Sequence, residues 1–393
     1  MRNTSPKAER PKPGRPLPVA RRTVVVVGAG IAGLAAARAL SQAGFRAIVL
    51  ERTAEPVHEG AGLQLSPNAC HVLRVLGAFR AVAAVAFAPE AVVLRRGRDG
   101  RVLSRFALGE VIRERHGAPY LVVERAILRN ALLGVCRADP DVDVRYGEGL
   151  ADAALHRNGV TVLTERGREI VAAGLVGADG VHSAARRFVA EAALPEDTGW
   201  TAWRATAPAD DDANVTTAWL GEAAHVVHYA MPNGDRLNVV AVLPDAAAPP
   251  LRRLAEWSPR LRERLAAAEG WAPWAIRTVG RGRWVHRAVA LIGDAAHAMP
   301  PYAAQGAAMA LEDAAVLADC ARADPDDMPA AWDAFARRRW PRVRMIGELT
   351  AANRRVYHIG GALARARDLA MRAAPQVVLQ RRMDAIYGWM PPI

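Results

Sequence analysis

The feature that most constrains the fold is a run of β-branched residues that meets a glycine-rich turn near the amino terminus. Residues 23–27 read TVVVV, which is typical of a strand buried on both faces. Gly28, Gly30 and Gly33 follow in the spacing GxGxxG, and the residues after them predict a helix over 31–43. The three glycines permit a tight turn, close approach of a phosphate, and close helix–strand packing, respectively. The pattern predicts an α/β domain that binds a dinucleotide.

An acidic residue follows this turn at the position that dinucleotide binding requires. Glu51 ends the next predicted strand, where its carboxylate can accept both hydroxyls of an adenosine ribose. Its neighbour Arg52, with Ile31 and Ala32 at the helix start, belongs to the same predicted site. The helix N-terminus adds about half a positive charge near the phosphates. This fingerprint alone does not distinguish NAD from FAD.

Two later strand-to-helix turns favour FAD. Asp294 follows a predicted strand over 288–292 and precedes a helix expected to start near Ala303. A carboxylate there can hold a ribityl hydroxyl, and the positive end of the helix can stabilise an anionic reduced flavin. Asp179 lies in a second such turn, where it can orient backbone groups toward a pyrophosphate. Ser183 can cap the helix that follows.

The residue pattern divides the remaining chain into regions. Alternating strands within 200–243 predict an antiparallel layer, and the pattern is helical from about 303 to 387, with Pro341 expected to kink one long helix. We therefore predict an α/β fold with a Rossmann-like FAD-binding domain, an inserted antiparallel β-sheet substrate domain and C-terminal helices. The expected ranges are 1–20 for a disordered basic tail, 21–90, 107–190 and 285–330 for the FAD-binding domain, 91–106 and 191–284 for the substrate domain, and 331–393 for the helical region.

The net charge of +12 does not point to a nucleic-acid partner. The excess lies in 1–22, a Pro-rich tail with a net charge of +6, and in 337–393, apparent helices with a net charge of +9. Nucleic-acid binding would favour basic residues interleaved with aromatics on one face, so solvated surface is the preferred interpretation. The three cysteines contain no CxxC, which excludes a zinc ribbon, a disulfide scaffold and a dithiol redox pair, and no metal site is expected.

The expected compartment is the cytoplasm. Arg21 and Arg22 before an apolar stretch resemble a secretion signal, but a strand, a glycine turn and a helix account for the same residues. No stretch reaches the ~18 apolar residues of a membrane span, so no membrane partner is expected.

Taken together, the three motifs resemble the class A, single-component flavin monooxygenases of the para-hydroxybenzoate hydroxylase group. The resemblance covers nearly the whole chain from residue 23. It is close to the branch of salicylate hydroxylase, 3-hydroxybenzoate 6-hydroxylase and 6-hydroxynicotinate 3-monooxygenase. The segments that carry it are GAGLQLSPNA at 60–69, WTAWR at 200–204, AQGAAMALEDA at 304–314 and IYGW at 386–389.

This resemblance implies FAD as the cofactor, NADH or NADPH as a transient co-substrate, and O2 as the oxidant. In the relatives a flavin hydroperoxide forms, and an electron-rich aromatic ring attacks its distal oxygen. The implied contacts are Glu51 and Arg125 for the adenosine and pyrophosphate, Leu63 and Gln64 for the neighbourhood of the flavin, Asp294 for the ribityl chain, and the N–H groups of Gly306 and Ala307 for the ring.

The attacking ring needs a deprotonated hydroxyl, and a phenol has a pKa near ~10, so a histidine that titrates near neutrality is a suitable base. His225 and Tyr229 lie on a predicted strand over 224–230 and share one face of it, whereas His228 faces the other way. In the resembling hydroxybenzoate and hydroxynicotinate enzymes, a His and a Tyr at this spacing contact the substrate. We therefore expect His225 to be the base and Tyr229 to hold the substrate oxygen. The alternative is an ordinary half-buried His and Tyr.

Pro300, Pro301 and Tyr302 are expected to wall the substrate pocket beside the flavin. Some relatives carry His or Gln in the last two positions, so the specificity for salicylate or 3-hydroxybenzoate does not transfer directly. Arg204 can meet a substrate carboxylate or form a structural salt bridge.

The predicted function is hydroxylation of a small phenolic or hydroxylated heteroaromatic substrate with NAD(P)H and O2, by an enzyme for which a homodimer is considered. One alternative is an FAD-dependent hydroxylase or epoxidase of a larger secondary metabolite. Another is an FAD-binding NADH oxidase without productive hydroxylation.

Overall fold

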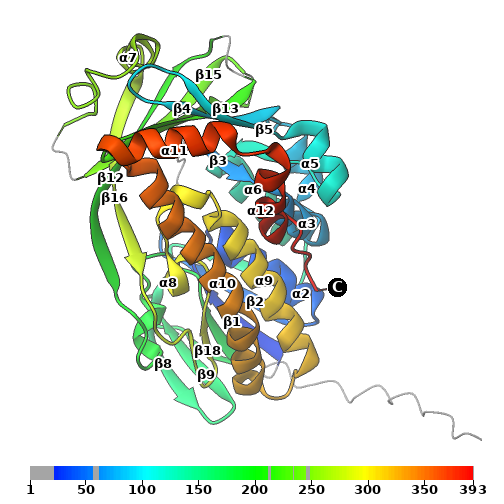
Figure 1. Cartoon of the computed structure of the whole chain (residues 1–393). Coiled ribbons are helices and arrows are strands. Elements are labelled where there is room, and N and C mark those ends of the chain that lie inside the picture. Colours follow the sequence, from blue (N-terminus) through cyan, green and yellow to red (C-terminus); the bar gives the residue numbers. More distant parts are fainter. Residues whose placement is uncertain (1–21, 56–61, 211–213, 233, 245–247, 393) are drawn as a thin grey trace, which may run out of the picture.

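The computed structural model describes residues 22–55, 62–210, 214–232, 234–244 and 248–392. The predicted basic tail lies outside these residues, as do residues 60 and 61 of the GAGLQLSPNA segment. Figure 1 shows two sheets at opposite ends of the molecule, with a long C-terminal helix running along one side of it.

A six-stranded sheet carries the predicted glycine turn. Its strands follow the order β17-β18-β11-β1-β2-β7, and all neighbours run parallel except β17 with β18. The central strand β1 is buried at every residue, as the TVVVV pattern predicts for a sheet covered on both faces. The bounds are β1 Thr23–Val27, β2 Arg46–Glu51, β7 Val142–Tyr146, β11 Gly174–Gly177, β17 Val285–His286 and β18 Val289–Leu291.

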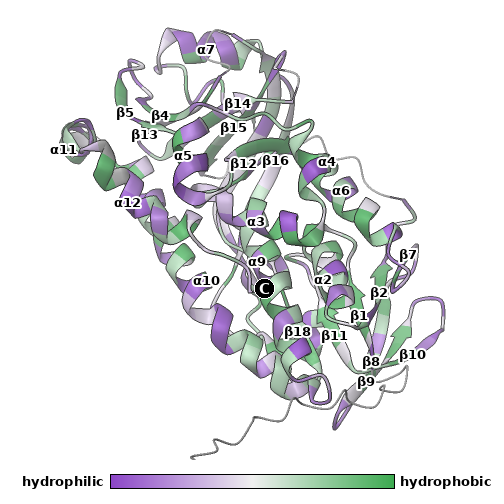
Figure 2. Ribbon diagram, turned by 90° about the vertical axis from the view of Figure 1, so that its right-hand side faces the viewer, coloured by the Kyte–Doolittle hydropathy of each residue, from purple (hydrophilic) through white to green (hydrophobic). Residues whose placement is uncertain are grey.

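Different layers cover the two faces of this sheet. On one face, helices α2, α3, α6 and α9 share a core with alternate residues of β1 and β2. On the other face, a three-stranded sheet in the order β10-β9-β8 and part of α10 share a second core. Figure 2 shows hydrophobic residues concentrated in β1, β2 and α2, whereas the peripheral helices α5 and α7 are largely hydrophilic. The bounds are α2 Ile31–Gln42, α3 Pro67–Leu76, α4 Phe79–Ala83, α5 Gly109–His116, α6 Arg125–Arg137, α7 Pro259–Ala266, β8 Leu150–His156, β9 Gly159–Thr164 and β10 Glu169–Ala172.

A seven-stranded sheet forms the second layer, in the order β16-β12-β15-β14-β13-β4-β5. The prediction of a wholly antiparallel sheet is wrong at one pair, because β4 runs parallel to β13. Strands β4 and β5 form a hairpin inserted from the first half of the chain, so their direction is not set by a turn with β13. The bounds are β4 Ala91–Arg96, β5 Val102–Ala107, β12 Pro195–Pro208, β13 Val215–Gly221, β14 Ala224–Ala230, β15 Arg236–Pro244 and β16 Glu269–Val279; a separate pair joins β3 Gly62–Leu65 to β6 Leu121–Glu124.

The C-terminal helices connect the two sheets. Helix α9, Gly306–Ala323, begins later than the predicted start near Ala303, because a 3₁₀ turn and the left-handed Ala304 precede it. Helix α10, Met328–His358, continues through Pro341, and α11, Gly361–Ala373, then turns back across β5. Helix α12, Gln376–Tyr387, lies beside α3 and β5. Among the described residues, no helix combines the length and the apolar character needed to cross a bilayer.

The glycine turn gives a direct test of the packing. Replacing Gly33 with Ala should lower the free energy of unfolding by several kcal/mol, because the new Cβ would overlap the carbonyl oxygen of Gly28. Replacing Gly30 with Ala is the matched control, since a Cβ there meets no atom within 4 Å. Urea denaturation measures both variants. Equal destabilisation by the two substitutions would contradict the packing assigned to Gly33.

Candidate active site

A cavity of about 1130 Å³ lies between the six-stranded and seven-stranded sheets. Every site residue expected from the sequence lines it, apart from Ala32 and Gly33, which lie in α2 behind the glycine turn. The lining residues among those expected are Gly28, Gly30, Ile31, Glu51, Arg52, Leu63, Gln64, Arg125, Asp179, His225, Tyr229, Asp294, Pro300, Pro301, Tyr302, Gly306 and Ala307. Segments far apart in the sequence therefore meet at one site.

The Glu51 carboxylate joins the glycine turn to the end of β2. Its Oε2 accepts the backbone N–H of Ala29 at 2.8 Å, and its Oε1 accepts the N–H of Thr53 at 3.0 Å. Oε1 also accepts the Thr53 hydroxyl at 3.0 Å, so about one of the roughly four acceptor positions of the carboxylate remains for a ribose hydroxyl at the cavity wall. Gly30 faces open space, since a Cβ there would meet no atom within 4 Å, and a ligand can reach the backbone.

Asp179 organises the second turn rather than reaching far into the cavity. Its carboxylate accepts Ser183 Oγ at 2.5 Å and the N–H of Ala184 at 2.6 Å. Ser183 Oγ in turn accepts the N–H of Arg186 at 3.1 Å, but the short 3₁₀ helix Ala185–Phe188 has Ala184 rather than Ser183 as its N-cap residue. Asp179 therefore sets the backbone conformation beside the cavity, and its role toward a pyrophosphate stays a prediction.

The third turn presents Asp294 and the start of α9. Asp294 begins the short helix α8, Asp294–His297, and its side chain is exposed to the cavity while its neighbours are buried. The preceding Gly293 has φ +56°, a left-handed conformation that favours glycine. Gly306 begins the 18-residue helix α9, and a Cβ there would also meet no atom within 4 Å. The positive end of α9 thus opens onto the cavity.

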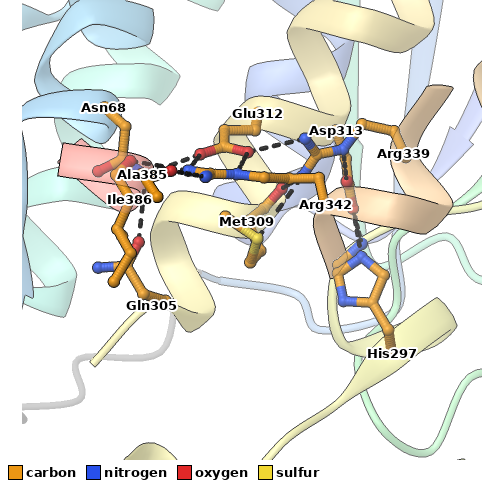
Figure 3. Close-up of polar contacts among 11 residues, drawn as sticks. Asn68, His297, Gln305, Met309, Glu312, Asp313, Arg339, Arg342, Ala385 and Ile386 are labelled. Carbon is orange, nitrogen blue, oxygen red and sulfur yellow. Dashed lines mark hydrogen bonds and ion pairs between the residues drawn. The ribbon is translucent and has the colours of Figure 1, made fainter. Parts of the chain in front are cut away.

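A buried ionic network supports this third turn (Figure 3). Asp313 accepts the N–H of Gly293 at 2.9 Å, His297 Nε2 at 2.6 Å and Arg339 Nε at 2.7 Å. Burial alone would raise the pKa of Asp313, but His297 and Arg339 beside it lower that pKa to about 2. His297 therefore helps to hold the shape of this loop.

Glu312 connects the ionic network to α3 and to the C-terminal segment. It accepts Arg339 Nη1 at 2.7 Å, Arg342 Nη2 at 2.8 Å and Asn68 Nδ2 at 2.7 Å. Arg342 also donates to the carbonyl oxygens of Ala385 and Ile386, which fastens the start of the C-terminal IYGW segment. In the sequence, these segments carry only the family resemblance. Two adjacent acids inside an apolar helix pattern were the signal for a buried ion network.

His225 lies in the wall contributed by β14, which has the predicted bounds. It is 3% exposed, and its Nδ1 lies 2.9 Å from His358 Nε2. Burial, with the nearby His358, lowers the pKa of His225 from 6.5 to about 3. The assumption that this histidine titrates near neutrality is therefore wrong. His358 is not predictable from the sequence as a neighbour of His225, because the two residues are 133 positions apart and no local pattern links them.

Tyr229 shares this face of β14, whereas His228 lies on the other face against Trp219, as predicted. Tyr229 is buried, and burial raises the pKa of its hydroxyl well above 10 although the charge of Arg204 lowers it. Its ring packs so closely on Gly62 that a Cβ there would lie 2.7 Å from Tyr229 Cε2.

Tyr302 completes the aromatic wall around His225. The ring centroids of Tyr302 and His225 are 5.3 Å apart, and burial raises the pKa of Tyr302 to about 12. Arg204 also lines the cavity, with its guanidinium 5.2 Å from the ring centroid of Trp274. The C-terminal helices add a wall that the sequence patterns do not predict, which consists of Leu349, Asn353, Val356, Tyr357, Met371, Arg382, Met383, Ile386 and Tyr387.

The comparison with protein families agrees with this arrangement. Residues 21–320 match the family described as FAD binding domain. The chain belongs to this family. Its curated relatives include the 3-hydroxybenzoate 6-hydroxylase of Polaromonas naphthalenivorans strain CJ2, 32% identical over 93% of this chain and 96% of the relative. They also include the 3-amino-4-hydroxybenzoate 2-monooxygenase PtnB3 of Streptomyces platensis, 34% identical over 94% and 96% of the two chains.

The fold is also similar to that of a solved structure that contains bound FAD. HpxO of Klebsiella pneumoniae, complexed with FAD and uric acid, superposes with a TM-score of 0.82 at 26% identity, over 94% of this chain and 97% of that one. These findings confirm the predicted fold class and the class A flavin monooxygenase family. FAD is the cofactor, and the chain is an FAD-dependent monooxygenase.

The ionic network predicts an unequal response at two aspartates of α9. Asp313→Asn should destabilise the protein by about 3–5 kcal/mol, because it removes the negative charge that pairs with the buried guanidinium of Arg339. Asp319→Asn is the control: Asp319 pairs with Arg338 near the surface and should cost about 1 kcal/mol or less. Urea denaturation at pH 7 measures both. Equal losses would contradict the assigned role of Asp313.

Asp313→Asn should also change how the free energy of unfolding depends on pH below neutrality. Because the folded pKa of Asp313 lies near 2, below an unfolded value near ~3.9, its ionised form stabilises the protein at neutral pH. That contribution is lost as the pH falls from about 4 to about 2. Asp313→Asn should therefore flatten the acid limb of the stability curve, whereas Asp319→Asn should leave most of it.

Proposed function

We propose that the protein hydroxylates a phenolic or hydroxylated heteroaromatic ring, with NADH or NADPH and O2 as co-substrates. One observation carries the proposal: His225 and Tyr229 line the same cavity as Asp294 and the start of α9. A ring held by the two side chains would therefore share a cavity with the cofactor. The names of the relatives, hydroxylases of 3-hydroxybenzoate and 3-amino-4-hydroxybenzoate, support this substrate class.

The cavity wall suits FAD in charge and in shape. Glu51 and Asp294 offer carboxylate acceptors for ribose and ribityl hydroxyls, and Arg125 offers a cation to the pyrophosphate. The N–H groups at the start of α9 would face the ring, where Gly306 carries no side chain to obstruct them. The chemistry that FAD supplies when bound is the activation of O2 for transfer of one oxygen atom.

His225 and Tyr229 would divide the handling of the substrate hydroxyl. With a pKa of about 3, His225 is neutral at pH 7, so a ring nitrogen is available to accept a hydrogen bond from the substrate hydroxyl. The pKa of Tyr229 is raised, so its hydroxyl stays protonated and can donate a hydrogen bond to the substrate oxygen. Together the two groups would hold and polarise the substrate hydroxyl, which makes the ring more electron-rich.

Arg204 supports a substrate that carries a carboxylate. Its charge acts on Tyr229, so it lies near the proposed position of the ring, and it borders the cavity. An arginine fork matches the geometry of a carboxylate. The aromatic and apolar groups Tyr302, Tyr357 and Met383 would pack around the ring itself.

The test is a screen of 3-hydroxybenzoate, 3-amino-4-hydroxybenzoate, 6-hydroxynicotinate and their analogues without the carboxylate. At least one acid should accelerate NADH or NADPH consumption and yield a product that has gained one oxygen atom. The neutral analogues should bind more weakly. If the reduced cofactor is consumed with every compound and only hydrogen peroxide appears, the protein is an oxidase and the proposal fails.

His225→Ala should separate flavin reduction from hydroxylation. We expect hydroxylated product to fall by about 10²-fold, the usual contribution of a positioned base, while reduction of FAD by NADH changes little. Hydrogen peroxide should account for the missing product. Val227→Ala is the control, because Val227 lines the cavity two residues along the same strand face and should keep product coupled to NADH. A parallel fall in reduction and hydroxylation would rule out the base assignment.

A further inference from the structure

The cavity continues beyond His225 and Tyr229 along the seven-stranded sheet. Strand register places six of its lining residues in one cross-strand row, each opposite the next on the neighbouring strand. From β5 to β12 the row consists of Ser104, Leu94, Ala218, Val227, Val240 and Arg204. Val227 lies between His225 and Tyr229 on the same face of β14. The row therefore extends to both sides of the position proposed for the reacting ring.

The row has polar groups at its two ends and aliphatic groups between them. The Arg204 guanidinium stands at one end and the Ser104 hydroxyl at the other. On β4 the cavity-facing Leu94 is partly exposed, whereas Val93, on the opposite face of the strand, is 2% exposed. Packing thus covers one face of β4 and leaves aliphatic surface of the other face open to the cavity.

The part of the row between β14 and β5 is the floor of a covered slot. Tyr357 of α10 and Met371 of α11 line the cavity and pack against the same apolar cluster as Leu94 and Val227, around Ala218. Helix α11 lies along β5 at this end of the sheet (Figure 1). Neighbouring strands are about 4.8 Å apart, so the three intervals from β14 to β5 span about 14 Å.

A single carboxylated ring would use only part of this row. With its ring at Val227 and its carboxylate at Arg204, such a compound would leave the slot toward Ser104 to water. Water between aliphatic walls finds few hydrogen-bond partners, so an apolar group that displaces it gains affinity. The slot therefore favours a substrate with an apolar group on the side of the ring away from its carboxylate.

We propose that the substrate is an extended aromatic acid, whose apolar substituent lies in the slot over Ala218 and Leu94 and points toward Ser104. The substituent is an alkyl chain or a second ring, since the slot is aliphatic over β13 and β4 and polar only at β5. Arg204 and Ser104 lie at opposite ends of one row, so the carboxylate and the substituent are para to each other. This substrate class rests on the proposed function and narrows it.

The first test measures binding to the FAD-loaded wild type. The probes are 3-hydroxybenzoate and its 4-alkyl derivatives from methyl to hexyl, and the change in flavin absorbance on titration gives each dissociation constant. We expect the affinity to rise about fourfold for each methylene that the slot buries. An affinity that stays constant or falls with chain length would overturn the slot, and it would do so even where the unsubstituted acid is hydroxylated and the proposed function stands.

The second test fills the slot. Ala218→Phe places a ring in the middle of the row, so the affinity ratio of the butyl to the unsubstituted acid should fall from about 10² to less than about 3. Ala266→Phe is the matched control and should keep the wild-type ratio. Ala266 is exposed on α7, whose Leu261 and Leu265 pack against the opposite face of the sheet.

The outcomes separate the slot from the hydroxylation. A rise with chain length that Ala218→Phe leaves unchanged would place the substituent elsewhere and overturn the slot. If Ala218→Phe does not fold, the wild-type series decides by itself. A wild type that binds the longer acids more tightly but hydroxylates no compound would support the slot and overturn the proposed function.

Discussion

The site depends on one buried carboxylate. Asp313 holds the N–H of Gly293, the ring of His297 and the guanidinium of Arg339 at once, so it joins the end of β18, α8, α9 and α10 at a single point. An ionised carboxylate is costly to bury unless several donors surround it, and here the donors come from separate segments. The native fold brings these donors to the Asp313 carboxylate. As a consequence, Asp294 and the start of α9 are set at the cavity wall.

The same arrangement explains how two sheets can share one cavity. Glu312, next to Asp313, binds Arg342, and Arg342 binds the carbonyl oxygens of Ala385 and Ile386. The C-terminal helices are thereby fixed where they meet β5 of the seven-stranded sheet. Helix α10 ends at His358, beside β14 and His225. The flavin side and the substrate side are therefore parts of one connected framework.

Local patterns predicted the first half of this framework well. The strand–turn–helix at residues 23–42 depends on neighbours in sequence, and the structure has it as predicted. The face of β14 that carries His225 and Tyr229 also follows from strand periodicity. In each case the controlling interactions are short-range, so a single sequence contains them.

Interactions between distant segments were not predictable in the same way. The His225–His358 contact, the network of Glu312 and the parallel pairing of β4 with β13 each join residues far apart in the chain. The pKa of His225 was misjudged for the same reason, because burial by distant elements sets it rather than the strand itself. The oligomeric state and the compartment stay predictions from the sequence.

The central claim is that this cavity transfers one atom of O2 to an aromatic ring. Turnover of the best acid from the screen under oxygen-18 gas, followed by mass spectrometry of the product, tests it most directly. The account predicts one labelled oxygen atom per product molecule, and no label when the isotope is supplied as water instead. A product labelled from water, or a ring recovered without a new oxygen atom, would contradict it.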